Sequence, residues 1–293
     1  MEKARRKTAQ IIVAVLLALV ALWASFKNIN GRDLLRSFAG VNWIWVAAAV
    51  AVSLVTVLIL SWRWRVLLSP RENDSVGSLF RLNIVSQFFN IVMPGRIGDI
   101  IKAFLASRGR QAHLGFVLGT VAIEKIFDLL VFALLWAMAP VLFIVGDSVS
   151  GFPLPLYLVP PAALMLIFIA WKPRALLAAA KVFRRLLPAR FREKALNSID
   201  QGLQAFTQLR SPLRLALVIF GSFGVLGGQV LTNCLLFRAF GLDLPLSAGI
   251  LVLLATQIIN IPPSVPGRIG IFEFSVILAL GVFPVTRDQS LSY

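Results

Sequence analysis

Residues 87–98 read QFFNIVMPGRIG, and residues 257–270 read QIINIPPSVPGRIG. Both stretches begin with Gln-x-x-Asn-Ile and end with Pro-Gly-Arg-Ile-Gly, and the second has two more residues between its asparagine and the shared pentapeptide. The shared signature predicts an internal duplication. Each copy places a cation and helix-breaking residues inside an apolar stretch. Polar breaks of this kind mark the substrate sites of many membrane transporters.

The composition predicts an all-α polytopic membrane protein. Hydrophobic residues make up 58% of the chain, charged residues only 14%, and the mean hydropathy is +0.85, which is far from the soluble norm. Several apolar runs are long enough to cross a bilayer. The expected uninterrupted spans are Gln10–Phe26, Asn42–Ser61, Leu114–Val145, Leu154–Trp171 and Leu213–Phe237. The first could also be a signal peptide, but we favour an uncleaved span because no clear cleavage site follows it.

The two apolar regions that hold the repeated motif are expected to be broken. Pro94 splits Leu79–Leu105 into halves of about 14 and 10 residues, and Pro262–Gly270 splits Leu246–Phe283 into halves of about 15. A full span needs about 20 residues, so each half is too short to cross alone. Two short halves around a break favour a re-entrant hairpin, which is covered by protein or a wet cavity. A full span with a proline kink is the alternative.

The net charge of +16 is distributed as the positive-inside rule requires, and no soluble basic domain is present to hold a nucleic acid. With the N-terminus in the cytoplasm, twenty cations lie in inside loops, four of them between Arg63 and Arg81, and five lie outside. The first hairpin then enters from the cytoplasm and the second from the opposite face. Repeats of opposite topology are typical of secondary transporters.

The chain is therefore expected to form one transmembrane domain over residues 1–293. Its repeat-like halves are about 40–145 and 213–293, joined by a cytoplasmic amphipathic connector at 172–212. Glycine pairs at Gly115–Gly119 and Gly224–Gly228 predict close helix packing. Tryptophans at both ends of the second span, Trp64 among them, predict an interfacial belt.

Charged residues at membrane depth are the candidates for chemistry. Four are acids and four are cations, and eight unpaired charges would cost more than about 20 kcal/mol at roughly 2.5–3.5 kcal/mol each. Glu124 and Asp128 are four residues apart and share one helix face, so cations should stand opposite. Arg96 and Arg268 are the expected partners. A purely structural ion-pair network stays open as an alternative.

Each repeated loop is expected to lead into a short helix, whose N-terminus offers free N–H groups and partial positive charge. With an arginine fork beside it, this predicts a site for a lipid phosphate at membrane depth. Asp99 and Glu273 should lie in the first turns of these helices. The lone Cys234 and His113 support no metal site, and we expect no cofactor and no catalytic residue. The predicted headgroup-binding residues are Asn90, Pro94, Gly95, Arg96, Gly98, Asp99, Lys102, Glu124, Asp128, Asn260, Pro266, Gly267, Arg268, Gly270 and Glu273.

The two PGRIG loops, the EKIFD stretch at Glu124–Asp128 and the IPPSVPGRIGIFEF segment together resemble the lysylphosphatidylglycerol synthase transmembrane region. This flippase-like family includes the flippase half of the multiple peptide resistance factor. The resemblance implies movement of lipid headgroups between leaflets, or support of envelope lipid synthesis. The chain lacks the soluble aminoacyl-transferase domain of the resistance factor. It stops at Gln289–Tyr293, where such proteins usually begin a final span, so we expect that span to be missing.

The leading hypothesis is a non-enzymatic flippase or lipid-binding transporter for a phospholipid or lipid-linked phosphate, multi-pass in the inner or plasma membrane. Its partners would be membrane lipids, with a homo-oligomer or an envelope enzyme left open. One alternative is an intramembrane enzyme that acts on lipid phosphates through Asp99, Glu124, Asp128 and Glu273. Another is an accessory scaffold for an envelope enzyme.

Overall fold

The computed structural model describes residues 40–68, 75–93, 97–108, 113–144, 200–259 and 271–283. These residues are helical and contain no strand, which confirms the expected all-α class. The elements in chain order are α3 Trp43–Leu67, α4 Val76–Val92, α5 Gly98–Arg108, α6 Leu114–Ile144, the 3₁₀ turn η2 Thr207–Arg210, α10 Pro212–Ala239, α11 Leu246–Ile259 and α12 Ile271–Leu280. The expected spans Gln10–Phe26 and Leu154–Trp171 lie outside the described residues.

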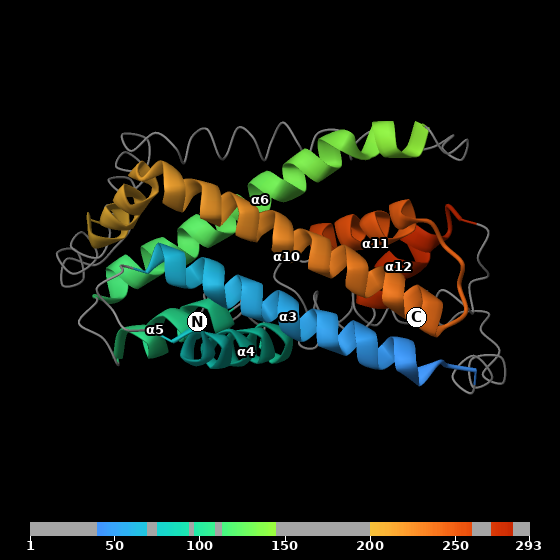
Figure 1. The fold of residues 1–293 in the computed structure, drawn as a ribbon, viewed down its shortest axis with the longest axis horizontal. Coiled ribbons are helices and arrows are strands. Elements are labelled where there is room, and N and C mark those ends of the chain that lie inside the picture. The colour runs from blue at the N-terminus through green and yellow to red at the C-terminus, as the bar shows by residue number, and fades with distance from the viewer. Residues whose placement is uncertain are drawn as a thin grey trace, which may run out of the picture.

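Two long helices, α3 and α10, form the centre of the molecule and pack against each other in antiparallel orientation (Figure 1). The N–H of Asn42, at the start of α3, donates to the carbonyl oxygen of Ala239 at the end of α10 (2.9 Å). A Cβ atom at Gly228 would lie 2.1 Å from Thr56 Oγ1, so only glycine allows this close approach. Both helices are long and apolar enough to cross a membrane.

The observed boundaries of α10 agree closely with those predicted from the sequence, whereas the end of α3 does not. α10 extends the expected Leu213–Phe237 by one residue at its start and two at its end. It stops before Gly241, whose φ of 69° is the left-handed conformation that ends many helices. The expected end of α3 at Ser61 is wrong, because the helix continues to Leu67. Arg63, Trp64 and Leu67 of these last turns are buried rather than solvated.

Helices α4 and α5 form an antiparallel pair on either side of the first motif. α4 has 17 residues and α5 has 11, and they are joined through residues 93–97. Asn83 of α4 contacts Lys102 of α5, while Asn90 contacts Asp99, so the partners run in opposite directions. A Cβ atom at Gly98 would lie 2.0 Å from the Ser86 carbonyl oxygen. The last glycine of the motif therefore permits the close packing of the pair.

Helices α11 and α12 make a second contacting pair, of 14 and 10 residues, on either side of the second motif. Figure 1 shows α4 and α5 toward one end of the long helices, and α11 and α12 toward the other. Glu273 lies in the first turn of α12 and Asp99 in the first turn of α5, as expected. Both motif-containing regions thus consist of two short helices around a break.

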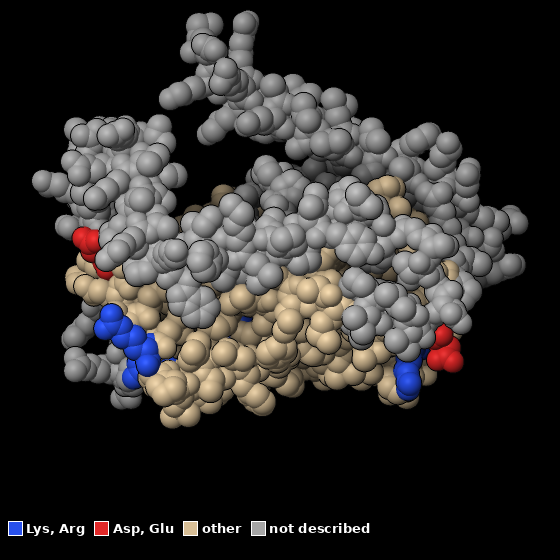
Figure 2. All heavy atoms as spheres, turned by 90° about the horizontal axis from the view of Figure 1, so that it is seen from above, with Lys and Arg blue, Asp and Glu red and all other residues tan. Residues whose placement is uncertain are grey.

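The two pairs have separate apolar cores. One cluster joins α4 and α5 to the C-terminal end of α3 and the start of α6, and includes Leu79 and Ala103. The other joins α11 and α12 to α10 and Trp136 of α6. On the face in Figure 2, the coloured charged side chains gather almost entirely near the two ends of the long axis.

The connector expected at 172–212 is described only from residue 200 onward. Its helical end packs on the protein, with Ala205 buried and Phe206 resting on the first cluster. A Cβ atom at Gly119 would lie 2.4 Å from the Gly202 carbonyl oxygen, so the Gly115–Gly119 pair receives this connector. The predicted close packing between membrane-length helices is confirmed for Gly224–Gly228, which faces α3, whereas the first glycine pair packs against the connector instead.

Candidate functional site

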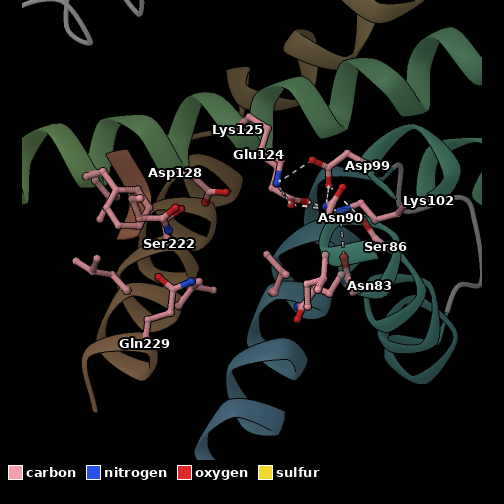
Figure 3. A pocket seen from close by; sticks show the side chains of 18 residues that line it. Asn83, Ser86, Asn90, Asp99, Lys102, Glu124, Lys125, Asp128, Ser222 and Gln229 are labelled. Carbon is pink, nitrogen blue, oxygen red and sulfur yellow. Dashed lines mark hydrogen bonds and ion pairs between the residues drawn. The ribbon is translucent and has the colours of Figure 1, made fainter. Parts of the chain in front are cut away.

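A polar cavity of about 270 Å³ lies between the two apolar clusters. On α10 the lining residues lie between Val218, which belongs to the cluster around α4 and α5, and Val230, which belongs to the cluster around α11 and α12. On α6 the lining residues precede Trp136, which belongs to the cluster around α11 and α12. Figure 3 shows Ser222 and Gln229 of α10 on one side of the cavity and the α4–α5 side chains on the other. The lining residues are Leu60, Asn83, Ser86, Gln87, Asn90, Ile91, Asp99, Lys102, Glu124, Lys125, Asp128, Val131, Phe132, Ser222, Val225, Leu226, Gln229 and Gln257.

Glu124 of α6 is the centre of an ion-pair cluster. Its carboxylate lies 3.0 Å from Lys102 Nζ and 3.7 Å from Lys125 Nζ, and a more distant contact of 4.0 Å joins it to Arg63 Nη2. The side chains of Glu124 and Lys102 are almost completely buried. A buried carboxylate of this kind depends on such partners, because burying an unpaired charge is costly.

Arg63 of α3 pairs with the second acid of the α6 face. Its Nη1 lies 2.7 Å from Asp128 Oδ1 and donates to Ser222 Oγ at 2.8 Å. The Arg63 side chain is completely buried, so counting it among the loop cations was wrong. The extra turns of α3 carry it inward. Gly221 of α10 leaves room for its stem, since a Cβ atom there would lie 3.1 Å from Arg63 Cβ.

Asp99 of α5 connects α4 to α6. Its Oδ1 accepts hydrogen bonds from Ser86 Oγ (3.2 Å) and Asn90 Nδ2 (3.3 Å), and its Oδ2 lies 3.4 Å from Lys125 Nζ. Its position in the first turn of α5 also suits the positive end of the helix dipole. The carboxylate therefore fixes α5 against both α4 and α6.

Lys102 is held on several sides besides the Glu124 carboxylate. Its Nζ donates to Asn83 Oδ1 at 3.0 Å and lies 4.3 Å from the centre of the Trp64 ring. Trp64 is fully buried and its Nε1 donates to Thr120 Oγ1 at 3.1 Å. Its assignment to an interfacial belt was therefore wrong. A buried indole needs an acceptor, and Thr120 supplies one.

The cavity brings together five of the predicted headgroup-binding residues, and these are Asn90, Asp99, Lys102, Glu124 and Asp128. Gly98 packs beside the cavity without lining it, and Glu273 is also not a lining residue. The remaining predicted residues, Pro94, Gly95, Arg96, Asn260, Pro266, Gly267, Arg268 and Gly270, lie outside the described residues. Among the described residues, the cations that face Glu124 and Asp128 are Arg63, Lys102 and Lys125, and the contacts of the expected partners Arg96 and Arg268 stay a prediction.

Sequence reasoning missed several polar residues of the site. They are Arg63, Asn83, Ser86, Gln87, Ser222, Gln229 and Gln257. The repeated motif could have revealed two of them, because Gln87 and Gln257 open the two copies of Gln-x-x-Asn-Ile. These equivalent residues, one from α4 and one from α11, line the same cavity.

The cluster of named charges is balanced, with three cations facing three carboxylates. Among the described residues, no group of three or more histidine, cysteine, aspartate or glutamate side chains could hold a metal ion. The arrangement can orient and hydrogen-bond a polar group in an apolar surrounding, since it offers charged, amide and hydroxyl side chains in one place.

Comparison with known proteins shows to which family the chain belongs. The sequence pattern of the lysylphosphatidylglycerol synthase TM region matches residues 11–293. The chain belongs to this family. A relative, the UPF0104 membrane protein MJ1078 of Methanocaldococcus jannaschii, is 26% identical over 196 residues, which cover 66% of this chain and 79% of that protein. No solved structure matches the chain.

Membership in the lysylphosphatidylglycerol synthase TM region family confirms the resemblance seen in the PGRIG and EKIFD motifs. The protein is thus a helical membrane protein of a family connected with lipid metabolism. Its α3 and α10 supply helices that can span a membrane. The polar cavity beside them is the candidate site for a lipid-related function.

Proposed function

We propose that this protein is a flippase or lipid-binding transporter, in which a lipid headgroup enters the polar cavity while its acyl chains stay in the bilayer. The observation that carries the proposal is the cavity of about 270 Å³, which is lined by ion pairs and amides and lies beside two membrane-length apolar helices. Ionisable groups inside a membrane domain usually mark a substrate or ion pathway. A headgroup is the part of a lipid that needs such a path.

An inverted repeat would give this cavity access to both leaflets. The order α3–α4–α5 is matched by α10–α11–α12, each consisting of one long helix followed by two short ones around a PGRIG motif. The antiparallel packing of α3 and α10 supports inversion, because corresponding helices of inverted repeats run in opposite directions. Re-entrant hairpins entering from opposite faces follow from the same arrangement.

The repeated arginines are proposed to receive the lipid phosphate. Arg96 and Arg268 precede α5 and α12, whose N-termini point partial positive charge toward the two breaks. The bidentate guanidinium fork matches phosphate oxygens better than an ammonium does. The glycines of the motif would let the headgroup approach the backbone.

We further propose an inner or plasma membrane location with a cytoplasmic N-terminus, on the basis of the loop cations. Moving Arg63 from loop to core leaves nineteen inside cations against five, so the bias persists. Transport is favoured over catalysis because Asp99, Glu124 and Asp128 are each held by a cation.

A leaflet assay tests the proposal. The purified chain is reconstituted into liposomes that carry a fluorescent phospholipid, and the fraction accessible to an external quencher is followed over time. We expect faster exchange than in protein-free liposomes, slower exchange for Arg96→Lys and Arg268→Lys, and unchanged melting of both variants. Exchange equal to that of protein-free liposomes would contradict the proposal. Lipid turnover by the detergent-purified protein would favour the enzyme alternative.

A further inference from the structure

Three glutamines give the cavity a neutral polar lining in addition to its charges. Gln87 of α4 and Gln257 of α11 occupy equivalent positions of the two motif copies, and Gln229 of α10 lies with them. A primary amide offers both N–H donors and an acceptor oxygen. A hydroxyl group likewise donates and accepts, so an amide can both donate to it and accept from it.

The amide oxygen of Gln229 is available to accept a hydrogen bond. The Oε1 atom of Gln229 is buried and has no hydrogen-bond partner among the described residues. Buried polar atoms in native proteins almost always have a hydrogen-bond partner. We therefore expect a bound ligand to donate a hydrogen bond to this oxygen. The oxygens of an ionised phosphate accept hydrogen bonds and cannot supply one. A hydroxyl can.

The ion pairs argue that the group bound here is neutral. Asp128 is paired with Arg63, and Glu124 with Lys102, at 2.7 and 3.0 Å. Asp99 accepts two hydrogen bonds and lies 3.4 Å from the Lys125 ammonium. An ammonium would have to compete with Arg63, Lys102 and Lys125 for these carboxylates. A neutral hydroxyl can bind without breaking any of these pairs.

The cavity volume is large enough for a small polar headgroup. A cavity of about 270 Å³ holds roughly nine waters at the density of liquid water, about 30 Å³ each. This space suits a glycerol unit or most of a single sugar ring.

We infer that the cavity selects lipids whose headgroup ends in neutral hydroxyls, a glycerol or a sugar, and that Gln87, Gln229 and Gln257 are the residues that bind them. The inference rests on the proposed function and adds the class of headgroup. The phosphate, where the lipid has one, stays at the PGRIG loops. Specificity then comes from hydrogen bonds of the amides, while the ion pairs hold the helices that carry them.

The test compares four lipids in the leaflet assay with the full chain: phosphatidylglycerol, a monoglucosyl diacylglycerol, phosphatidylethanolamine and phosphatidic acid. We expect the two hydroxyl-bearing lipids to exchange about tenfold faster than the other two, the ratio that one net hydrogen bond of about 1.4 kcal/mol gives. Gln229→Met should remove most of this preference. Gln87→Met, on the exposed face of α4, should weaken it without affecting folding.

The matched control is Gln204→Met, since Gln204 does not line the cavity and should keep the wild-type preference. Equal exchange of all four lipids, unchanged by the Gln87 and Gln229 substitutions, would overturn the inference and leave the proposed function standing. Faster exchange of phosphatidylethanolamine would also overturn it, because it would show selection of an ammonium. If the wild type exchanges none of the lipids, both the inference and the proposed function fail.

Discussion

Replacing Asp128 with asparagine removes the closest charged partner of a completely buried arginine. Arg63 Nη1 lies 2.7 Å from Asp128 Oδ1, and the variant leaves Arg63 with Ser222 and with Glu124 at 4.0 Å. Breaking a buried ion pair costs roughly 3–5 kcal/mol. Because asparagine can still accept a hydrogen bond and Glu124 stays near, we expect a loss at the lower end, about 3 kcal/mol of unfolding free energy.

The matched control is Lys125→Met. Its ammonium also contacts carboxylates, at 3.4 and 3.7 Å, but the Lys125 side chain is 39% exposed, and exposed pairs contribute about 0–1 kcal/mol. Both variants are purified in the same detergent, and their unfolding midpoints and free energies are compared with those of the wild type. The double variant Arg63→Met/Asp128→Leu should recover part of the loss, because it leaves no orphaned charge.

Two outcomes would refute this reasoning. Equal, small losses for Asp128→Asn and Lys125→Met would show that the Arg63 pair is solvated. A double variant as unstable as the sum of Arg63→Met and Asp128→Leu, each measured alone, would show that the two side chains do not interact.

Two further predictions address packing and topology. Gly228→Ala should destabilise the protein by about 1–3 kcal/mol, because its Cβ would clash with Thr56, whereas Gly227→Ala has open space and should be neutral or slightly stabilising in the same unfolding experiment. Ser150→Cys in a Cys234→Ala background should react with an impermeant thiol reagent from the external side only; labelling only from the cytoplasm would invert the proposed orientation.

The long helices could be predicted from sequence because hydropathy and helix-end signals are local. α10 was placed to within two residues, since Pro212 suits a first helical turn and Gly241 a helix end. The same rules misplaced the end of α3. Arg63 resembles a cation that marks a membrane boundary, and its partner Asp128 is 65 residues away in sequence. Nothing local distinguishes a boundary arginine from a buried one.

The candidate site could be predicted in kind but not in detail. The spacing of Glu124 and Asp128 correctly indicated one helix face that needs opposing cations. Which cations face it depends on how α3, α5 and α6 pack. That information lies in long-range contacts such as Lys102 with Glu124, and the sequence pattern of either helix alone does not contain it. The repeated glutamines were visible in the motif but carried no charge to draw attention to them.

The central claim, that a lipid headgroup passes through the polar cavity, is tested most directly by filling that cavity. Ile91 lines it and is 51% exposed, so Ile91→Trp can add bulk there without disturbing a packed core. The adjacent Val92 is 48% exposed and is not a lining residue, which makes Val92→Trp a matched control. In the leaflet assay, we predict that Ile91→Trp slows lipid exchange toward the protein-free rate while Val92→Trp exchanges lipid like the wild type. Equal exchange by both variants and the wild type would contradict the claim.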